Sequence, residues 1–167
     1  VSLIVLETED AVGFRRGRNL KKLGMKGSDT AELFFEDVCV QKANLLGPEE
    51  GQGFYQLMKQ LPWERLMIGV TALGFIDFAI AETVKYVQDR KAFGKRIMDF
   101  QITRFKLAEC KTKAELLRSF VNDGLARLET GELDAATASM AKWWGSQMQN
   151  EVMHECLQLH GGYGFMM

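Results

Sequence analysis

A glutamate and an arginine stand side by side in KQLPWERLMIG, where Glu64 and Arg65 follow Pro62 inside an otherwise apolar run. A carboxylate held in a partly dry pocket just after a helix break becomes a stronger base and can abstract a proton from carbon. Arg65 points about 100° away around a helix, so it is better placed to bind another anion than to neutralise Glu64. The alternative is a solvated glutamate in a first helical turn, where the helix dipole favours negative charge.

Basic and aromatic side chains gather in RKAFGKR, residues 90–96. Arginine can form two parallel hydrogen bonds with a phosphate, and Phe93 before a glycine could press on a flat ring where the backbone comes close. Cations at a helix C-terminus are also favoured by the helix dipole alone. Without further evidence, the dipole is the simpler interpretation of this segment.

The glycines of QLHGGYGF, residues 158–165, can end a helix and let the backbone approach a ligand, with Gln158 and His160 as polar contacts. The dinucleotide fingerprint requires a strand before the glycines and a helix after them, whereas a helical pattern precedes them here. Taken alone, the segment is more simply a helix C-cap.

Three long helices must position these segments. The first is expected from about Gly53 to Gln88, with Pro62 predicting either a kink or a new helix start near Leu61. The second helix has apolar residues at seven-residue intervals, which predict the core of a bundle. These residues are Phe100, Leu107, Ala114, Val121 and Leu128, and the stripe is widened by Cys110 and Leu117.

Capping residues bound the second and third helices. Asp99 is a suitable N-cap and Gly131 a suitable C-cap for the second helix, and the third is expected from near Asp134 to just before Gly161. Antiparallel helices of this length, well above the mean of about 11 to 12 residues, predict a mainly α fold that is most of a long bundle. Residues available for the buried face of the third helix are Ala138, Ala141, Met148, Val152 and Leu159.

Residues 1–47 have the pattern of strands and turns: SLIVLE, then GFRRGRN, then the alternation in AELFFEDVCV. So few strands cannot form a stable sheet alone, so we expect a partial β-domain over 1–47 and a helical-bundle domain over 48–167. The sequence begins within a predicted strand and ends just past the glycines. We therefore expect a piece of a longer protein.

Composition excludes several classes of function. The 167 residues include 47% hydrophobic and 26% charged residues, and the formal net charge of −1 gives no field that would hold a nucleic acid. No stretch approaches the roughly 20 apolar residues of a membrane span. Neither histidine has a neighbour at metal-ligand spacing, so no metal site is expected. Three widely spaced cysteines, with one left over in any pairing, indicate reduced thiols.

The three chemical segments, in this order between long helices, resemble the acyl-CoA dehydrogenase family, and LPWER resembles its long-chain type. LKKLGMKGSDTAELFFEDVCV, residues 20–40, is similar to the end of the family's middle β-domain. DRKAFGK with Gln101 is similar to its R-x-x-F-G-x-x-x-x-x-x-Q segment, and QLHGGYGF to its Q-x-x-G-G-x-G segment. The resemblance covers essentially the whole chain.

The resemblance implies a flavoprotein of fatty-acid β-oxidation that oxidises acyl-CoA thioesters to trans-2-enoyl-CoA. In the family a glutamate removes the α-proton while the β-hydrogen leaves as hydride to flavin N5. Long-chain and isovaleryl-type members carry this base on the first helix of the C-terminal domain, immediately before an arginine. The resemblance therefore implies that Glu64 is the base and that Arg65 contacts the CoA portion of the substrate.

The resemblance also implies a cofactor and partners. FAD would be shared across a subunit interface, so the helical domain would be the core of a homodimer or homotetramer, with electron-transfer flavoprotein as the acceptor. Members of the family are found in bacterial cytoplasm or in the mitochondrial matrix, and the absence of a visible targeting segment favours bacterial cytoplasm. The implied FAD contacts are Arg90, Ala92, Phe93 and Gln101, together with Gln158, Gly161 and Gly162.

Two alternatives stay open. Most family members carry the base in a loop near their C-terminus, and in that case Glu64 would be a bystander and the base would lie beyond Met167. The chain could also belong to a non-catalytic helical oligomerisation module. Because the family fold needs further helices and strands, we expect the 167 residues by themselves neither to bind FAD tightly nor to turn over.

Overall fold

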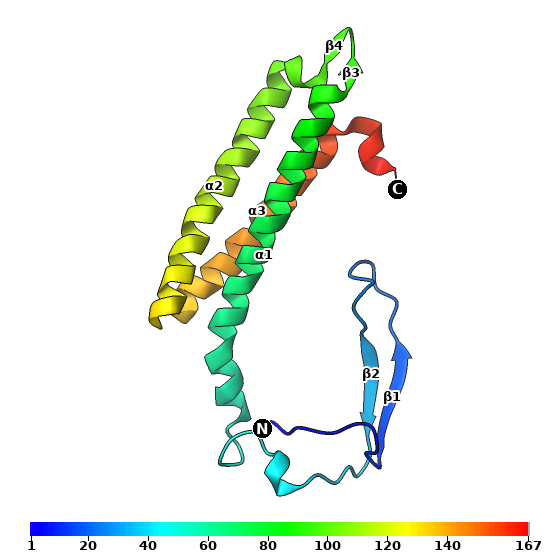
Figure 1. Cartoon of the computed structure of the whole chain (residues 1–167), viewed down its shortest axis with the longest axis vertical. Coiled ribbons are helices and arrows are strands. Elements are labelled where there is room, and N and C mark those ends of the chain that lie inside the picture. Colours follow the sequence, from blue (N-terminus) through cyan, green and yellow to red (C-terminus); the bar gives the residue numbers. More distant parts are fainter. Residues whose placement is uncertain (167) are drawn as a thin grey trace. The chain divides into compact units, whose positions relative to one another are not determined.

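The structure, a computed structural model, describes residues 1–166. The chain divides into two compact units, one over residues 1–57 and a second that begins at Met58. Strands and turns make up most of the first unit, and helices dominate the second (Figure 1). The mainly α fold is therefore confirmed. The predicted division into domains over 1–47 and 48–167 stays a prediction.

Two antiparallel strands, β1 (Phe14–Asn19) and β2 (Ala31–Phe35), form the sheet of the first unit. Phe14 pairs with Phe35, and their rings lie 5.3 Å apart. The strand predicted over SLIVLE is wrong, because Ile4 makes only an isolated bridge to Leu45. A single bridge leaves most backbone groups of that segment without ladder partners, so no strand forms.

Three long helices form most of the described chain: α1 (Gly53–Asp89), α2 (Gln101–Thr130) and α3 (Ala135–Leu159). From Met58 onward the three helices lie side by side as an antiparallel bundle (Figure 1). Helix α1 continues through Pro62 without interruption, so a new helix does not begin near Leu61. Short 3-10 turns, η1 (Lys42–Asn44), η2 (Ile97–Asp99) and η3 (Gly161–Phe165), complete the element order with strands β3 (Lys91–Ala92) and β4 (Lys95–Arg96).

Two of the three predicted caps are confirmed. Asp134 accepts a hydrogen bond from the Thr137 backbone N–H at 2.8 Å, and Gly131 ends α2 with a left-handed φ of 74°. The Asp99 prediction is wrong, because α2 begins after Phe100. Asp99 instead belongs to η2, where its carboxylate accepts hydrogen bonds from Arg96, which also lower the pKa of Asp99.

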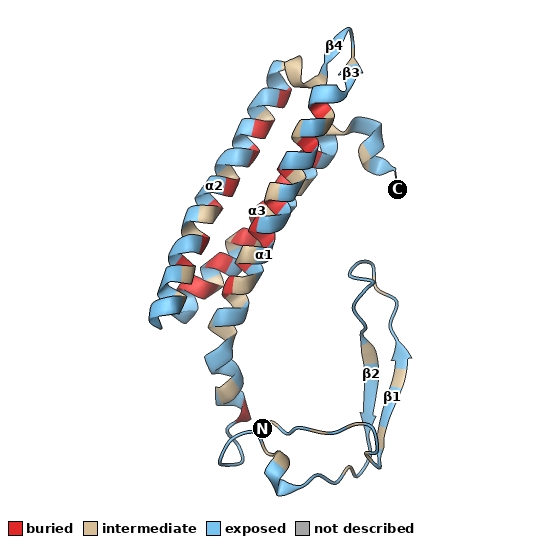
Figure 2. Cartoon of the chain, viewed as in Figure 1, coloured by how far each residue is buried: buried red, intermediate tan, exposed pale blue. Residues whose placement is uncertain are grey.

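The core lies along the predicted stripes of α2 and α3, together with one face of α1 (Figure 2). Leu117, Val121 and Val152 are almost completely buried there. Phe100, Leu128 and Leu159, at the ends of the predicted stripes, are only half-buried because they lie where the helices end. Two glycines let α1 and α3 approach closely: a Cβ on Gly145 would lie 3.1 Å from the Cα of Gly69.

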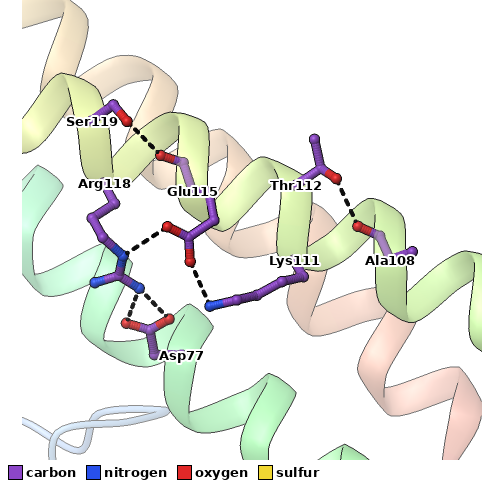
Figure 3. Close-up of polar contacts among 7 residues, drawn as sticks. All are labelled: Asp77, Ala108, Lys111, Thr112, Glu115, Arg118 and Ser119. Carbon is purple, nitrogen blue, oxygen red and sulfur yellow. Dashed lines mark hydrogen bonds and ion pairs between the residues drawn. The ribbon is translucent and has the colours of Figure 1, made fainter.

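Charged pairs connect the helices at the rim of this core. Arg118 on α2 donates two hydrogen bonds to Asp77 on α1, at 2.7 and 2.8 Å, and this contact raises the pKa of Arg118 (Figure 3). Lys113 on α2 donates to Glu151 on α3 at 2.7 Å, and Lys106 pairs with Glu155. Because these side chains remain about one-third exposed, solvent screens each pair and its contribution to stability is small.

Helix α1 is also long and apolar enough to cross a membrane by length and composition alone, with a mean hydropathy of 1.6 over an 18-residue window. The prediction that no stretch approaches a membrane span in length and apolar composition is therefore wrong. Leu66, Ile76 and Val87 of α1 are completely buried in the helical unit. A bundle core requires such residues, but only 28% of that window is buried, so packing within the described chain explains part of this composition.

Candidate active site

Glu64 lies on α1, two residues after Pro62, and its side chain is exposed. It forms no hydrogen bond or ion pair with residues 1–166. The helical repeat places Glu64 on the same face of α1 as Ile68, Thr71 and Phe75, because these residues follow at intervals of three and four. The carboxylate is therefore free at one end of a largely apolar helix face.

This apolar face of α1 contains a shallow hollow. It is lined by Thr71, Gly74, Phe75 and Phe78, and both phenylalanine rings are exposed, at 46% and 66%. Large exposed apolar surfaces that lie together mark sites for a ligand, a partner or another part of the protein. Here the surface continues along the helix from the carboxylate of Glu64.

Arg65 is half-buried and points to α3, where its Nη1 donates a hydrogen bond to the Ser139 hydroxyl at 2.9 Å. The two adjacent side chains thus diverge, as the helical geometry predicts. The Ser139 partner was not foreseen, because no local pattern relates residues 74 positions apart. Arg65 forms no ion pair with residues 1–166, so its remaining N–H groups can still meet an anion.

The basic segment after α1 forms a β-hairpin, which the sequence did not predict. Lys91 pairs with Arg96 and Ala92 with Lys95, so Phe93 and Gly94 are the two central residues of the turn. Both have positive φ, 54° and 80°, as a type I′ hairpin turn requires. Positive φ strains a bulky residue such as phenylalanine, and the Phe93 side chain is 93% exposed.

Within this hairpin the cations differ in their partners. Arg96 is held by Asp99, with an N–O distance of 2.9 Å, and Lys95 lies 4.1 Å from the centre of the Phe100 ring. Arg90 is exposed and forms no ion pair with any residue the structure describes. Arg90 is therefore the guanidinium here that is free to bind an anion. Gln101, the first residue of α2, is also exposed at this end of the bundle.

The glycine-rich segment follows α3 directly. Gln158 is exposed in the last turn of α3, and Gly161 has a φ of 58°, a conformation that favours glycine. Gly161 and Gly162 are exposed, and a Cβ on either would meet no atom within 4 Å. Their backbone is thus open to an approaching group. The predicted end of α3 before these glycines is confirmed.

The hairpin and the glycine-rich turn lie together at one end of the bundle. The Arg90 guanidinium carbon lies 5.7 Å from the centre of the Tyr163 ring, so the two segments, 73 positions apart, meet across this end. Glu64 is elsewhere, because Arg90 follows it by 26 residues, or about 39 Å along a helix. The structure therefore joins two of the three predicted segments and separates the third.

His160 has an inward role that sequence reasoning missed. Its ring stacks on Tyr86 with centroids 4.3 Å apart, and its Nε2 lies 3.3 Å from the Thr83 hydroxyl. The sequence suggested His160 as a ligand contact, whereas its ring is engaged by α1. The spacing of Thr83, Tyr86 and Arg90 along one helix face was the only available signal.

Comparison with known proteins identifies this arrangement. The family described as "Acyl-CoA dehydrogenase, C-terminal domain" matches residues 51–167. The chain belongs to the acyl-CoA dehydrogenase family. The resemblance drawn from the three motifs is therefore confirmed.

Individual acyl-CoA dehydrogenases match over nearly the whole chain. The mitochondrial long-chain specific acyl-CoA dehydrogenase of Rattus norvegicus is 50% identical over 166 residues, which are 99% of this chain and 38% of that enzyme. The crystal structure of acyl-CoA dehydrogenase from Geobacillus kaustophilus has a TM-score of 0.94 and 47% identity, and the match covers 99% of this chain and 43% of that one. The chain thus spans less than half the length of these relatives.

A third relative has a different name. A subunit of the caffeyl-CoA reductase-Etf complex of Acetobacterium woodii is 38% identical over 153 residues, which are 92% of this chain and 40% of that subunit. The family therefore includes proteins named as reductases as well as dehydrogenases.

Proposed function

We propose that the intact protein is an FAD-dependent acyl-CoA dehydrogenase that converts an acyl-CoA thioester to the trans-2-enoyl-CoA, with Glu64 as the base. The observation that carries the proposal is the free, exposed carboxylate of Glu64 at the end of an apolar helix face. The 50% identity to a long-chain specific enzyme supports this assignment. Relatives named as reductases are less similar, so oxidation is the favoured direction.

Glu64 would remove the proton from the α-carbon of the thioester. Its carboxylate can do so because it has no internal partner that would have to be displaced first. Arg65 would contact the CoA portion while its hydrogen bond to Ser139 fixes its direction. FAD, when bound, supplies the two-electron acceptor for the hydrogen that leaves the β-carbon.

The hollow further along the same helix face as Glu64 suits an acyl chain. Ile68, Thr71 and Phe75 continue the face that begins at Glu64, and Phe75 lies about 16 Å further along the helix. A hydrocarbon chain laid along this face would bury apolar surface on both sides. The acyl-CoA substrate is thus matched by a carboxylate for its reacting carbon and an apolar wall for its chain.

The residues at the other end fit the phosphates and adenosine of FAD. Arg90 offers a free guanidinium, Phe93 an exposed ring, and Gly161 and Gly162 an open backbone. These are the donors and flat surfaces that bind a pyrophosphate and an aromatic base. Ala92, Gln101 and Gln158 lie on the same hairpin and helix ends and complete the proposed set.

A separation of about 39 Å along α1 implies that Glu64 and Arg90 of one chain serve two different FAD molecules. Each FAD would then take its base from one subunit and its adenosine contacts from another. This supports a homodimer or a homotetramer built through the helical domain. The relative named as part of an Etf complex supports an electron-transfer flavoprotein as acceptor. Bacterial cytoplasm and the mitochondrial matrix both suit such a protein.

An anaerobic visible spectrum of the intact protein tests the proposal. Adding a long acyl-CoA should bleach the flavin band of the wild type, and Glu64→Gln should slow bleaching by about 10² to 10⁴-fold because glutamine is not a base. Glu82→Gln is the matched control, since Glu82 is exposed on α1 about five turns further along and pairs with Lys85.

Each contrary result has a distinct meaning. Equal bleaching of wild type and Glu64→Gln would move the base to a segment beyond residue 167. Absence of flavin from the intact wild-type protein would favour a non-catalytic oligomerisation module.

A further inference from the structure

The turn after α3 is held to the end of α1 by a set of contacts that the proposed reaction does not use. Tyr86 stacks on the His160 ring at 4.3 Å with an interplanar angle of 16°, and its hydroxyl donates to the His160 carbonyl at 3.2 Å. One residue of α1 therefore fixes both the side chain and the backbone of the residue just before Gly161.

Thr83 adds a third contact to His160. Its side chain is buried, with 1% exposure, and its hydroxyl lies 3.3 Å from Nε2 of the imidazole. Buried hydroxyl groups cost free energy unless they are hydrogen-bonded, so this contact constrains the ring from the side of the core. His160 also caps α3, with its backbone N–H donating to the Leu157 carbonyl at 3.1 Å.

The same face of α1 leads to Arg90. Thr83, Tyr86 and Arg90 are separated by three and four residues, and Arg90 lies over Tyr163 in the same turn that His160 enters. On its other side the turn packs closely against the end of α3. A Cβ on Gly164 would come within 2.6 Å of the Leu157 carbonyl oxygen, so this approach requires glycine. The backbone at residues 161 and 162 is thus set between two anchored points.

We propose that Tyr86 and Thr83 are positioning residues that hold the open Gly161–Gly162 backbone beside Arg90, so that both contact the same FAD. The inference rests on the proposed function. A rigid pyrophosphate contact requires donors fixed within a fraction of an ångström, and exposed glycines cannot supply that rigidity themselves. Tyr86 and Thr83 together form a clamp on His160, and this clamp supplies the rigidity without touching the cofactor.

The test measures the FAD dissociation constant of the intact protein, after removal and re-addition of FAD, together with the unfolding midpoint of the apoprotein. Tyr86→Phe keeps the stacked ring and removes the hydroxyl, and Thr83→Val keeps the shape and removes the hydrogen bond. Each should weaken FAD binding by about threefold to tenfold, the effect of one lost hydrogen bond. The rate of flavin reduction in the fully loaded variant should stay unchanged.

Matched controls remove equivalent hydroxyls elsewhere. Tyr55→Phe removes an exposed hydroxyl near the start of α1, and Thr112→Val removes a hydroxyl that only donates back to the Ala108 carbonyl. Both should bind FAD as the wild type does. The clamp variants should differ from both controls in FAD affinity, and any loss of apoprotein stability should be smaller than the loss of FAD affinity.

Three results would overturn the inference: unchanged FAD affinity in both clamp variants, weaker affinity that the controls share, or weaker affinity fully matched by lower apoprotein stability. The proposed function fails separately, since it fails only if the intact wild-type protein binds no FAD or the flavin is not reduced by acyl-CoA.

Discussion

The two chemical regions of the helical unit are built in opposite ways. Glu64 is exposed and has no hydrogen-bonding or ionic partner among residues 1–166, so only the backbone of α1 fixes its place. At the other end, stacking and hydrogen bonds join Tyr86 to His160 beside the proposed FAD contacts. In the proposed function, the group that exchanges a proton is thus left free, whereas the backbone that contacts a rigid ligand is fixed in advance.

A substitution at Phe93 should change FAD affinity and the free energy of unfolding in opposite directions, and this is the largest effect expected at the proposed FAD contacts. Phe93→Asn should weaken FAD binding by about tenfold, because an exposed ring is lost. It should leave the free energy of unfolding unchanged or raise it by about 1 kcal/mol, because Asn-Gly suits a type I′ turn better than Phe-Gly. Flavin titration and urea unfolding of the intact apoprotein measure the two effects.

Phe93→Tyr is the matched control for this position, since it keeps a flat ring and should keep the affinity. Wild-type affinity in Phe93→Asn would show that the strained turn serves no cofactor.

Acid should lower the stability of the packing between α2 and α3, and this effect should be smaller than that of Phe93→Asn on FAD binding. Hydrogen bonds from Lys106 and Lys113 lower the pKa of Glu155 and Glu151. A lowered folded-state pKa contributes stability that is present above the unfolded value of about 4.3 and is lost as pH falls through the folded value. Because both pairs are about one-third exposed, solvent screens them and the loss per pair should be small.

Urea unfolding of the intact protein between pH 6 and 3, compared with Glu155→Gln, measures this loss. The variant should be less stable than wild type at pH 6 and should approach it as pH falls. A difference that does not change with pH would mean that Lys106 and Glu155 are not ion-paired in solution.

The sequence predicted those features that depend on local or periodic signals. Asp134 and Gly131 were recognised as caps because capping chemistry involves residues only a few positions apart. The buried stripe of α2 followed from its seven-residue repeat. The type of residue at each site could also be predicted: a carboxylate near a proline, cations beside a glycine, and a glycine pair at a helix end.

Most of the features that were missed depend on contacts between distant parts of the chain. Asp99 looked like a helix cap, but Arg96 and η2 use its carboxylate. Arg65 looked free, but it donates to Ser139, and His160 looked like a ligand contact, but Tyr86 covers its ring. For Arg65 and His160 the partner lies on another helix, and a single sequence carries no signal for that pairing. Arg96 lies only three residues from Asp99, so in that case a local partner was overlooked.

The account's central claim is that Glu64 and the Arg90 end of one chain serve different FAD molecules. Co-expression of Glu64→Gln with an Arg90→Ala, Phe93→Asn chain, each with its own tag, gives mixed oligomers that can be isolated by both tags. We predict acyl-CoA oxidation by the mixed oligomer although neither parent is active, because one of its sites combines an intact base with intact cofactor contacts. Activity no higher than that of the parents would contradict the claim.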